Sequence, residues 1–132
     1  MQKLRRLPGL IRHVRPDEAR LMGTVAMFPR VNVQVGFGRL ELSRILDVYG
    51  RMVAAGYWRD YAVQFDRDAA VFAAFRRAAE RPEMRIEKRP ALRNRQGEWA
   101  LIGESGSVLK RGHDLGPVLA PIERRLIKLV SA

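Results

Sequence analysis

The sequence has 132 residues and a mass of 15.1 kDa, which fits one domain with a short tail and excludes two domains of ordinary size. Its 25 basic and 14 acidic side chains give a formal net charge of +11, so anionic partners are expected. Cysteine is absent, which excludes disulfides, cysteine nucleophiles and thiolate metal sites and suits a reducing compartment. Hydrophobic residues make up 47% of the chain, which is enough for a packed core.

The first 30 residues differ from the rest in composition. They hold seven basic and two acidic side chains, and prolines interrupt them repeatedly. We expect residues 1–30 to form a flexible basic arm and residues 31–132 to form a single domain. A targeting peptide is not favoured, because the arm contains no serine. No stretch reaches the roughly 18 consecutive apolar residues of a membrane span, so we expect a cytoplasmic protein without a membrane partner.

A strand and a helix are the first predicted elements. Residues 31–37, VNVQVGF, alternate apolar and polar side chains, which is typical of a half-buried strand. From Arg39 to Ala55 apolar residues recur at spacings of three and four, which predicts a helix that ends at Gly56. The apolar stripe of this helix consists of Leu42, Ile45, Leu46, Tyr49, Met52 and Val53.

Three further segments read as strands of a meander. Residues 57–65 and 84–88 alternate clearly between apolar and polar side chains. Residues 70–79 fit a strand as well, although their alanine-rich composition leaves a helix as the alternative. Asp-rich and Pro-containing turns separate these segments, and we therefore predict antiparallel neighbours.

The last third of the chain predicts a hairpin and a second helix. Residues 98–103 and 108–111 flank the turn ESGS, and Asp114 can cap a helix that Pro121 should kink or restart near Ala120. The predicted fold class is α+β, with the order β-α-β-β-β-β-β-α. It consists of a mostly antiparallel sheet with two helices packed on one face.

Residue types for metal binding and nucleophilic catalysis are sparse. The chain contains only two histidines, His13 and His113, so zinc and haem sites are not expected and no cofactor is predicted. Ser105, Ser107 and His113 include the types of a nucleophilic site, but they lack a strand-to-helix elbow. We therefore predict no catalytic residues.

The strongest functional signal is the basic segment 76–95, which holds eight basic and three acidic residues. Arginine side chains beside exposed aromatic rings bind single-stranded nucleic acid through phosphate contacts and base stacking. We therefore predict an Arg-rich sheet face that binds RNA, DNA or another polyanion, with a merely solvated face as the alternative. If 70–77 and 84–89 pair, alternation places these side chains away from the core: Phe72, Arg76, Arg85 and Arg89, with Trp58 nearby.

A second basic group lies in the segment LKRGHDL, residues 109–115. Lys110, Arg111 and His113 surround a glycine directly before the predicted second helix. Free N–H groups at a helix start could bind a phosphate or carboxylate there. The alternative, which the sequence favours, is that Asp114 itself occupies this position as the capping anion of the helix.

Four segments, residues 49–65, 70–78, 84–88 and 109–115, resemble a family of small alphaproteobacterial proteins catalogued as domain of unknown function 2794. The motif GRMVAAG followed by WRDYA carries most of this resemblance, which covers approximately residues 33–120. The resemblance implies a bacterial cytoplasmic protein. It implies no particular activity, cofactor or catalytic residue.

Three functions remain open at this stage. The first is a non-enzymatic binding module for nucleic acid or another polyanion, whose affinity would fall steeply with salt. The second is an adaptor that docks on another protein through an exposed strand or the terminal helix. The third is a small-molecule enzyme with a pocket formed by four residues: Arg59, Tyr61, Lys110 and His113.

Overall fold

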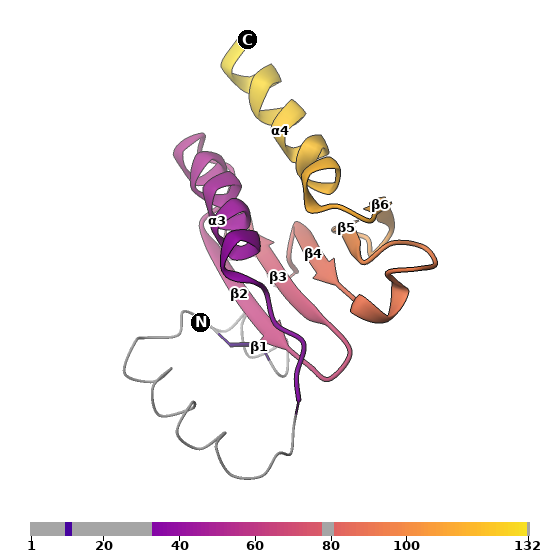
Figure 1. The fold of residues 1–132 in the computed structure, drawn as a ribbon. Coiled ribbons are helices and arrows are strands. Elements are labelled where there is room, and N and C mark those ends of the chain that lie inside the picture. Colours follow the sequence, from indigo (N-terminus) through magenta and orange to yellow (C-terminus); the bar gives the residue numbers. More distant parts are fainter. Residues whose placement is uncertain (1–9, 12–32, 78–80, 132) are drawn as a thin grey trace.

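An antiparallel sheet of six strands forms the centre of the fold (Figure 1). The computed structural model describes residues 10–11, 33–77 and 81–131. The order of the strands in the sheet is the same as their order in the sequence, so each strand pairs with the strand before it and the strand after it. The strands are β1 (Leu10–Ile11), β2 (Asp60–Phe65), β3 (Ala70–Phe75), β4 (Met84–Lys88), β5 (Trp99–Gly103) and β6 (Val108–Gly112).

Two helices, α3 (Arg39–Ala54) and α4 (Leu115–Ser131), cover one face of this sheet (Figure 1). α3 contacts β2 and β3 through the ring of Tyr49, and α4 packs against β5 and β6. A short 3-10 helix, η1 (Pro90–Leu92), lies in the connection between β4 and β5. The fold is therefore α+β with both helices on one face, as predicted.

Strand register decides which side chains form the core. Val63, Phe72, Ile86 and Leu101 are successive cross-strand partners in β2 to β5, and all four are buried beneath the helices. Burial of each such side chain contributes about 1.5–3 kcal/mol to stability. The helices add their own buried side chains to this core: Ile45, Val48 and Met52 from α3, and Val118, Leu119 and Ile122 from α4.

The predicted strand at residues 31–37 is wrong over its described part. Residues 33–38 pair with no strand of the described sheet, and Val33 is 83% exposed. This segment is attached to the sheet by the Val35 N–H, which donates to the Asp66 carbonyl at 2.7 Å, and by Lys88 Nζ, which donates to the Gly36 carbonyl at 3.0 Å. The ring of Phe37 also packs against Phe65 and Trp99. The position beside β2 belongs instead to β1, in which Leu10 pairs with Gln64. Alternation indicates an extended segment but does not specify its partner.

The remaining predicted elements agree with the structure. Residues 70–75 form a strand, so the helical alternative for this segment is wrong. α4 continues through Pro121 as one helix, although this proline removes one backbone donor. The predicted basic arm, residues 1–30, lies outside the described residues apart from Leu10 and Ile11. In the described part of the chain, no helix is both long and apolar enough to cross a membrane.

Glu41 fixes the start of α3 and connects it to the sheet. Its carboxylate accepts a hydrogen bond from the Gly38 backbone N–H at 2.6 Å and one from Lys88 Nζ in β4 at 2.7 Å. Burial raises the pKa of Glu41, but these two interactions outweigh it and hold the pKa below the usual value of 4.5. The charged form therefore stabilises the folded state above about pH 4.5, and this stabilisation is lost as the pH falls below that value.

We predict that Glu41→Gln lowers the free energy of unfolding by about 1 kcal/mol at pH 7. The substitution should also reduce the loss of stability between pH 5 and pH 3, because the carboxylate that titrates there is gone. Urea denaturation at both pH values measures the two effects. Asp47→Asn is the matched control on the same helix, since its exposed ion pair with Arg51 should contribute less than about 0.5 kcal/mol. Equal losses in both variants would contradict the role given to Glu41.

Candidate anion-binding site

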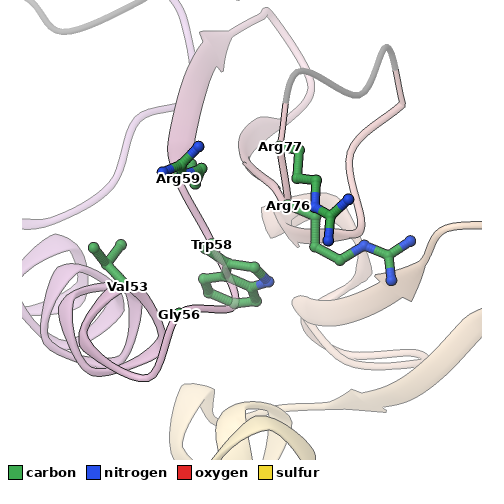
Figure 2. A pocket seen from close by; sticks show the side chains of 6 residues that line it. All are labelled: Val53, Gly56, Trp58, Arg59, Arg76 and Arg77. Carbon is green, nitrogen blue, oxygen red and sulfur yellow. The ribbon is translucent and has the colours of Figure 1, made fainter.

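A cavity of about 430 Å³ lies where the end of α3 meets the start of β2 and the end of β3 (Figure 2). Arg59 directly precedes β2, and Arg76 and Arg77 directly follow β3. Asp60 pairs with Phe75 in the antiparallel ladder, so these flanking residues meet at the same end of the sheet. The cavity is lined by Val53, Gly56, Trp58, Arg59, Arg76 and Arg77.

The turn from α3 into β2 brings Trp58 and Arg59 to the cavity. Gly56 adopts a φ of 84°, a left-handed conformation that ends the helix, and its N–H bonds the Val53 carbonyl. The Tyr57 N–H donates to the Met52 carbonyl at 2.9 Å, and the Arg59 N–H donates to the Phe75 carbonyl at 2.8 Å. The backbone of Arg59 is thus held against β3 by a sheet-type hydrogen bond.

Glu83 is a buried carboxylate that organises the wall of the cavity. Its Oε1 accepts a hydrogen bond from Trp58 Nε1–H at 2.5 Å, and Arg125 of α4 donates to its two oxygens at 3.3 and 3.1 Å. The guanidinium of Arg125 also lies 4.5 Å from the ring centre of Tyr57. This network fixes Trp58 and connects α4 to the segment before β4.

The charge of Arg76 is only partly compensated. Its Nε lies 3.6 Å from Glu83, and its Nη2 lies 3.5 Å from Glu104. Both contacts are ion pairs at the long end of hydrogen-bond distances, and they orient the guanidinium between two carboxylates. The Arg76 side chain is 50% exposed. It therefore retains N–H donors for a ligand.

Arg59 has no acidic partner among the described residues, and its side chain is exposed. Arg77 is exposed as well and lies beside Arg76 at the end of β3 (Figure 2). The described residues that line the cavity include three guanidinium groups and no carboxylate. The lining side chains themselves are therefore basic, while Glu83 and Glu104 lie within ion-pair distance of Arg76.

An aromatic cluster lies behind the cavity, towards the core. Tyr61 stacks on Phe72 with ring centres 5.0 Å apart, and Tyr49 contacts both rings edge-on. Burial, with a smaller contribution from Asp60, raises the pKa of Tyr49 to about 12. Tyr49 is therefore a neutral phenol near pH 7.

The structure contradicts the predicted exposure of two aromatic site residues. Phe72 is 1% exposed and Trp58 is 2% exposed, so neither ring presents a face for base stacking. The register explains the error for Phe72, because its partner in β4 is Ile86, whereas Arg85 pairs with Ala73. Phe72 and Arg85 therefore lie on opposite faces of the sheet.

The predicted basic residues do not gather on one surface. Arg89 follows β4 at the opposite end of the sheet from Arg76 and forms an ion pair with Glu87 at 3.2 Å. The predicted sheet face of Arg76, Arg85 and Arg89 with Trp58 and Phe72 is therefore not assembled. Arg76 and Trp58 remain together only in the lining of the cavity.

The residues predicted near the start of α4 also lie away from the cavity. Gly112 pairs with Trp99 at the sheet end opposite Arg59 and Arg76. His113 Nδ1 lies 3.0 Å from the Arg93 carbonyl, Arg111 donates to the Gly97 carbonyl at 3.5 Å, and Lys110 is exposed on β6. The predicted pocket of Arg59, Tyr61, Lys110 and His113 is consequently wrong as a set, since only Arg59 lines the cavity.

Sequence reasoning missed Val53, Gly56, Glu83 and Arg125 as parts of the site. A usable signal was present for the arginines, because Arg59 directly precedes one strand and Arg77 closely follows the next. Antiparallel neighbours place such flanking residues at the same end of the sheet. No local pattern indicated Arg125, which reaches Glu83 from a helix 42 residues further along the chain.

Comparison with known proteins identifies the family of the chain. The family described as Protein of unknown function (DUF2794) matches residues 35–119. The chain belongs to this family. The DUF2794 region contains all six residues that line the cavity, whereas Arg125 lies beyond it. Comparisons with curated proteins and with solved structures gave no match.

The residues described here also form no metal site. No group of three or more histidine, aspartate and glutamate side chains in the described ranges could hold a metal ion. The charged side chains in the lining of the cavity are therefore arginines. Such groups bind carboxylate and phosphate oxygens through paired N–H donors.

We predict that Glu83→Gln lowers the free energy of unfolding by about 2 kcal/mol. The expected loss is smaller than the roughly 3–5 kcal/mol of a fully buried pair, because Arg125 retains contact with water. Chemical denaturation monitored by tryptophan fluorescence measures it. Glu104→Gln is the control, since this exposed carboxylate should contribute less than about 0.5 kcal/mol. A loss for Glu83→Gln no larger than the control would refute the role of Glu83 as an organising group.

Proposed function

We propose that this DUF2794 protein binds a small anionic ligand in the cavity at the end of α3. The observation that carries the proposal is that Arg59, Arg76 and Arg77 all line one cavity, whose described lining contains no carboxylate side chain. Guanidinium forks match the oxygens of phosphates and carboxylates in both geometry and charge. An anion is therefore the ligand that this site favours.

The size of the cavity supports a small molecule. Its volume of about 430 Å³ lies within the range of roughly 300–1,000 Å³ that is typical of ligand pockets. None of the six lining side chains is a nucleophile or a general base at neutral pH. We therefore propose binding without catalysis. The absence of cysteine supports a cytoplasmic location as part of this proposal.

Nucleic-acid binding is the second candidate function. The formal net charge of +11 supports it, because a basic surface attracts the phosphate backbone. The division of Arg76 and Arg89 between two ends of the sheet, and the burial of Phe72, weigh against an extended stacking surface. We therefore favour the cavity over the sheet face as the ligand-binding site.

We predict that inorganic phosphate binds the protein and that Arg59→Gln weakens this binding by about 10-fold, which corresponds to loss of one charge-assisted contact. Arg59 is the best position for this test because its replacement leaves no acidic partner behind among the described residues. Isothermal titration calorimetry at low ionic strength measures the dissociation constants. The affinity should decrease as sodium chloride is added, since ions screen the arginines.

Arg67→Gln is the matched control for this measurement. Arg67 is an exposed arginine in the turn between β2 and β3, at the opposite end of the sheet from the cavity. Its replacement removes the same net charge and should change the phosphate affinity less than about twofold. Equal weakening by both substitutions, or no detectable binding of phosphate, would contradict the proposed site.

A further inference from the structure

The sheet has an exposed edge at β6. Each of β2 to β5 has a neighbouring strand on both sides, and none of their residues is exposed. In the described sheet β6 has a neighbour on one side only, β5, and its first three residues, Val108, Leu109 and Lys110, are all exposed. The outward backbone N–H and C=O groups of such an edge can pair with a further strand.

Apolar side chains are part of this edge. Val108 is 50% exposed and Leu109 is 49% exposed, and they are the only large apolar side chains of β2 to β6 that are exposed. α4 packs at the other end of β6, where a Cβ atom on Gly112 would lie 3.7 Å from Val118. Val108 and Leu109 thus remain in contact with water. A strand added beside β6 would cover them, which is favourable in proportion to the apolar area buried.

The register of β6 places one apolar and one basic side chain on each of its faces. Val108 and Arg111 share a face, because their partners in β5 are two residues apart. Lys110 pairs with the residue between those partners and therefore lies on the other face. Leu109 is the extra residue of a β-bulge, and its side chain lies beside Gly103 on the face of Lys110. A strand paired with this edge would meet an apolar and a basic side chain on either face.

Basic side chains give this edge a positive charge. Neither Lys110 nor Arg111 has an acidic partner among the described residues. Arg111 donates to the neutral Gly97 carbonyl at 3.5 Å, which leaves its charge uncompensated. The nearest acidic residue in the sequence, Asp114, lies beyond the end of the strand. Opposite charges on paired strands attract, so the edge favours a strand that carries carboxylates.

A second copy of this chain does not meet that requirement. Antiparallel pairing of two β6 strands would bring Lys110 and Arg111 of one copy close to the same two residues of the other, and like charges on paired strands are destabilising. Lysine and a bulge also protect many sheet edges against pairing. Protection alone would not require Val108 and Leu109 to be exposed, because charged side chains serve it better. The exposed apolar residues therefore indicate a partner, and the charge specifies an acidic one.

We infer that β6 binds an extended acidic segment of another protein, which adds to the sheet as a further strand. Backbone hydrogen bonds to the edge supply affinity, and the side chains of β6 select the sequence of the segment. Val108 and Leu109 contact its apolar side chains, and Lys110 and Arg111 pair with its carboxylates. This surface shares no residue with the cavity, so the inference is independent of the proposed ligand binding.

The first test compares fluorescently labelled synthetic peptides by anisotropy. The peptide EVEVEV combines acidic and β-branched residues, KVKVKV reverses the charge, and ESESES removes the apolar side chains. EVEVEV should bind about tenfold or more tightly than either of the other two, and added sodium chloride should weaken it. Equal affinities for the three peptides, or no binding of EVEVEV, would overturn the inference.

The same assay examines the backbone pairing. A version of EVEVEV that is methylated on every backbone nitrogen keeps all side chains but has no N–H donor for the edge. It should bind about tenfold or more weakly than the unmodified peptide. Unchanged affinity would mean that side-chain charge alone attracts the peptide, and strand addition would then be wrong.

The second test reverses one charge of the edge. Lys110→Glu should weaken EVEVEV by about tenfold or more and strengthen KVKVKV. Arg67→Glu is the matched control, because Arg67 is exposed in the turn between β2 and β3, and it should change both affinities less than about twofold. Circular dichroism verifies that both variants fold. Equal weakening of EVEVEV by the two substitutions would overturn the inference, since net charge and not the edge would then attract the peptide.

The third test asks whether a second copy occupies the edge instead. Analytical ultracentrifugation compares the oligomeric state of the unmodified protein with that of Val108→Lys, which replaces an apolar residue of the edge by a further cation. A monomer, or an oligomer that Val108→Lys leaves intact, supports the inference because β6 is then free for another protein. A dimer that Val108→Lys converts to a monomer would overturn it.

Discussion

The antiparallel pairing of β2 with β3 is the constraint on which the rest of the structure depends. Its register, with Asp60 opposite Phe75, places Arg59 beside Arg76 and Arg77 at one end of the sheet. The same register turns Val63 and Phe72 towards the helices, where they enter the core. A shift by one residue would reverse the faces of a whole strand, so the core and the cavity are specified together.

Glu83 extends this constraint from the sheet to α4. The carboxylate of Glu83 is buried, and a buried charge is unfavourable unless it has hydrogen-bond and ion-pair partners. These partners are the Trp58 ring N–H and the guanidinium of Arg125. Arg76 shares the same carboxylate at longer distance and therefore keeps its orientation. One buried acid thus holds Trp58 in place and orients an arginine in the lining of the cavity.

The sequence predicted where helices and strands lie better than it predicted which other elements they pack against or pair with. The apolar spacing located α3 and its end near Gly56 correctly, because helix period and C-terminal glycine are local features. The predicted stripe was partly misplaced, since Val48 is buried whereas Leu46 and Val53 are exposed. Which residues of a helix face the core depends on the position of the sheet beneath it. The segment after residue 31 was predicted to be a strand because its apolar and polar residues alternate. Alternation indicates an extended backbone, but it does not show whether a neighbouring strand is available for pairing.

The sequence by itself determined the fold class, the basic charge, the lack of cysteine chemistry and the positions of most helices and strands. These properties follow from composition and from patterns of apolar residues within 20 residues or fewer. Such patterns indicate helices and strands because the side-chain periods of 3.6 and 2 are local properties of the backbone. Only the tertiary structure decided that Arg59 joins Arg76 at one cavity while Arg89 lies at the far end, and that Phe72 is buried. Those outcomes depend on strand register and on the docking of α4, and both are set by contacts between residues distant in the chain.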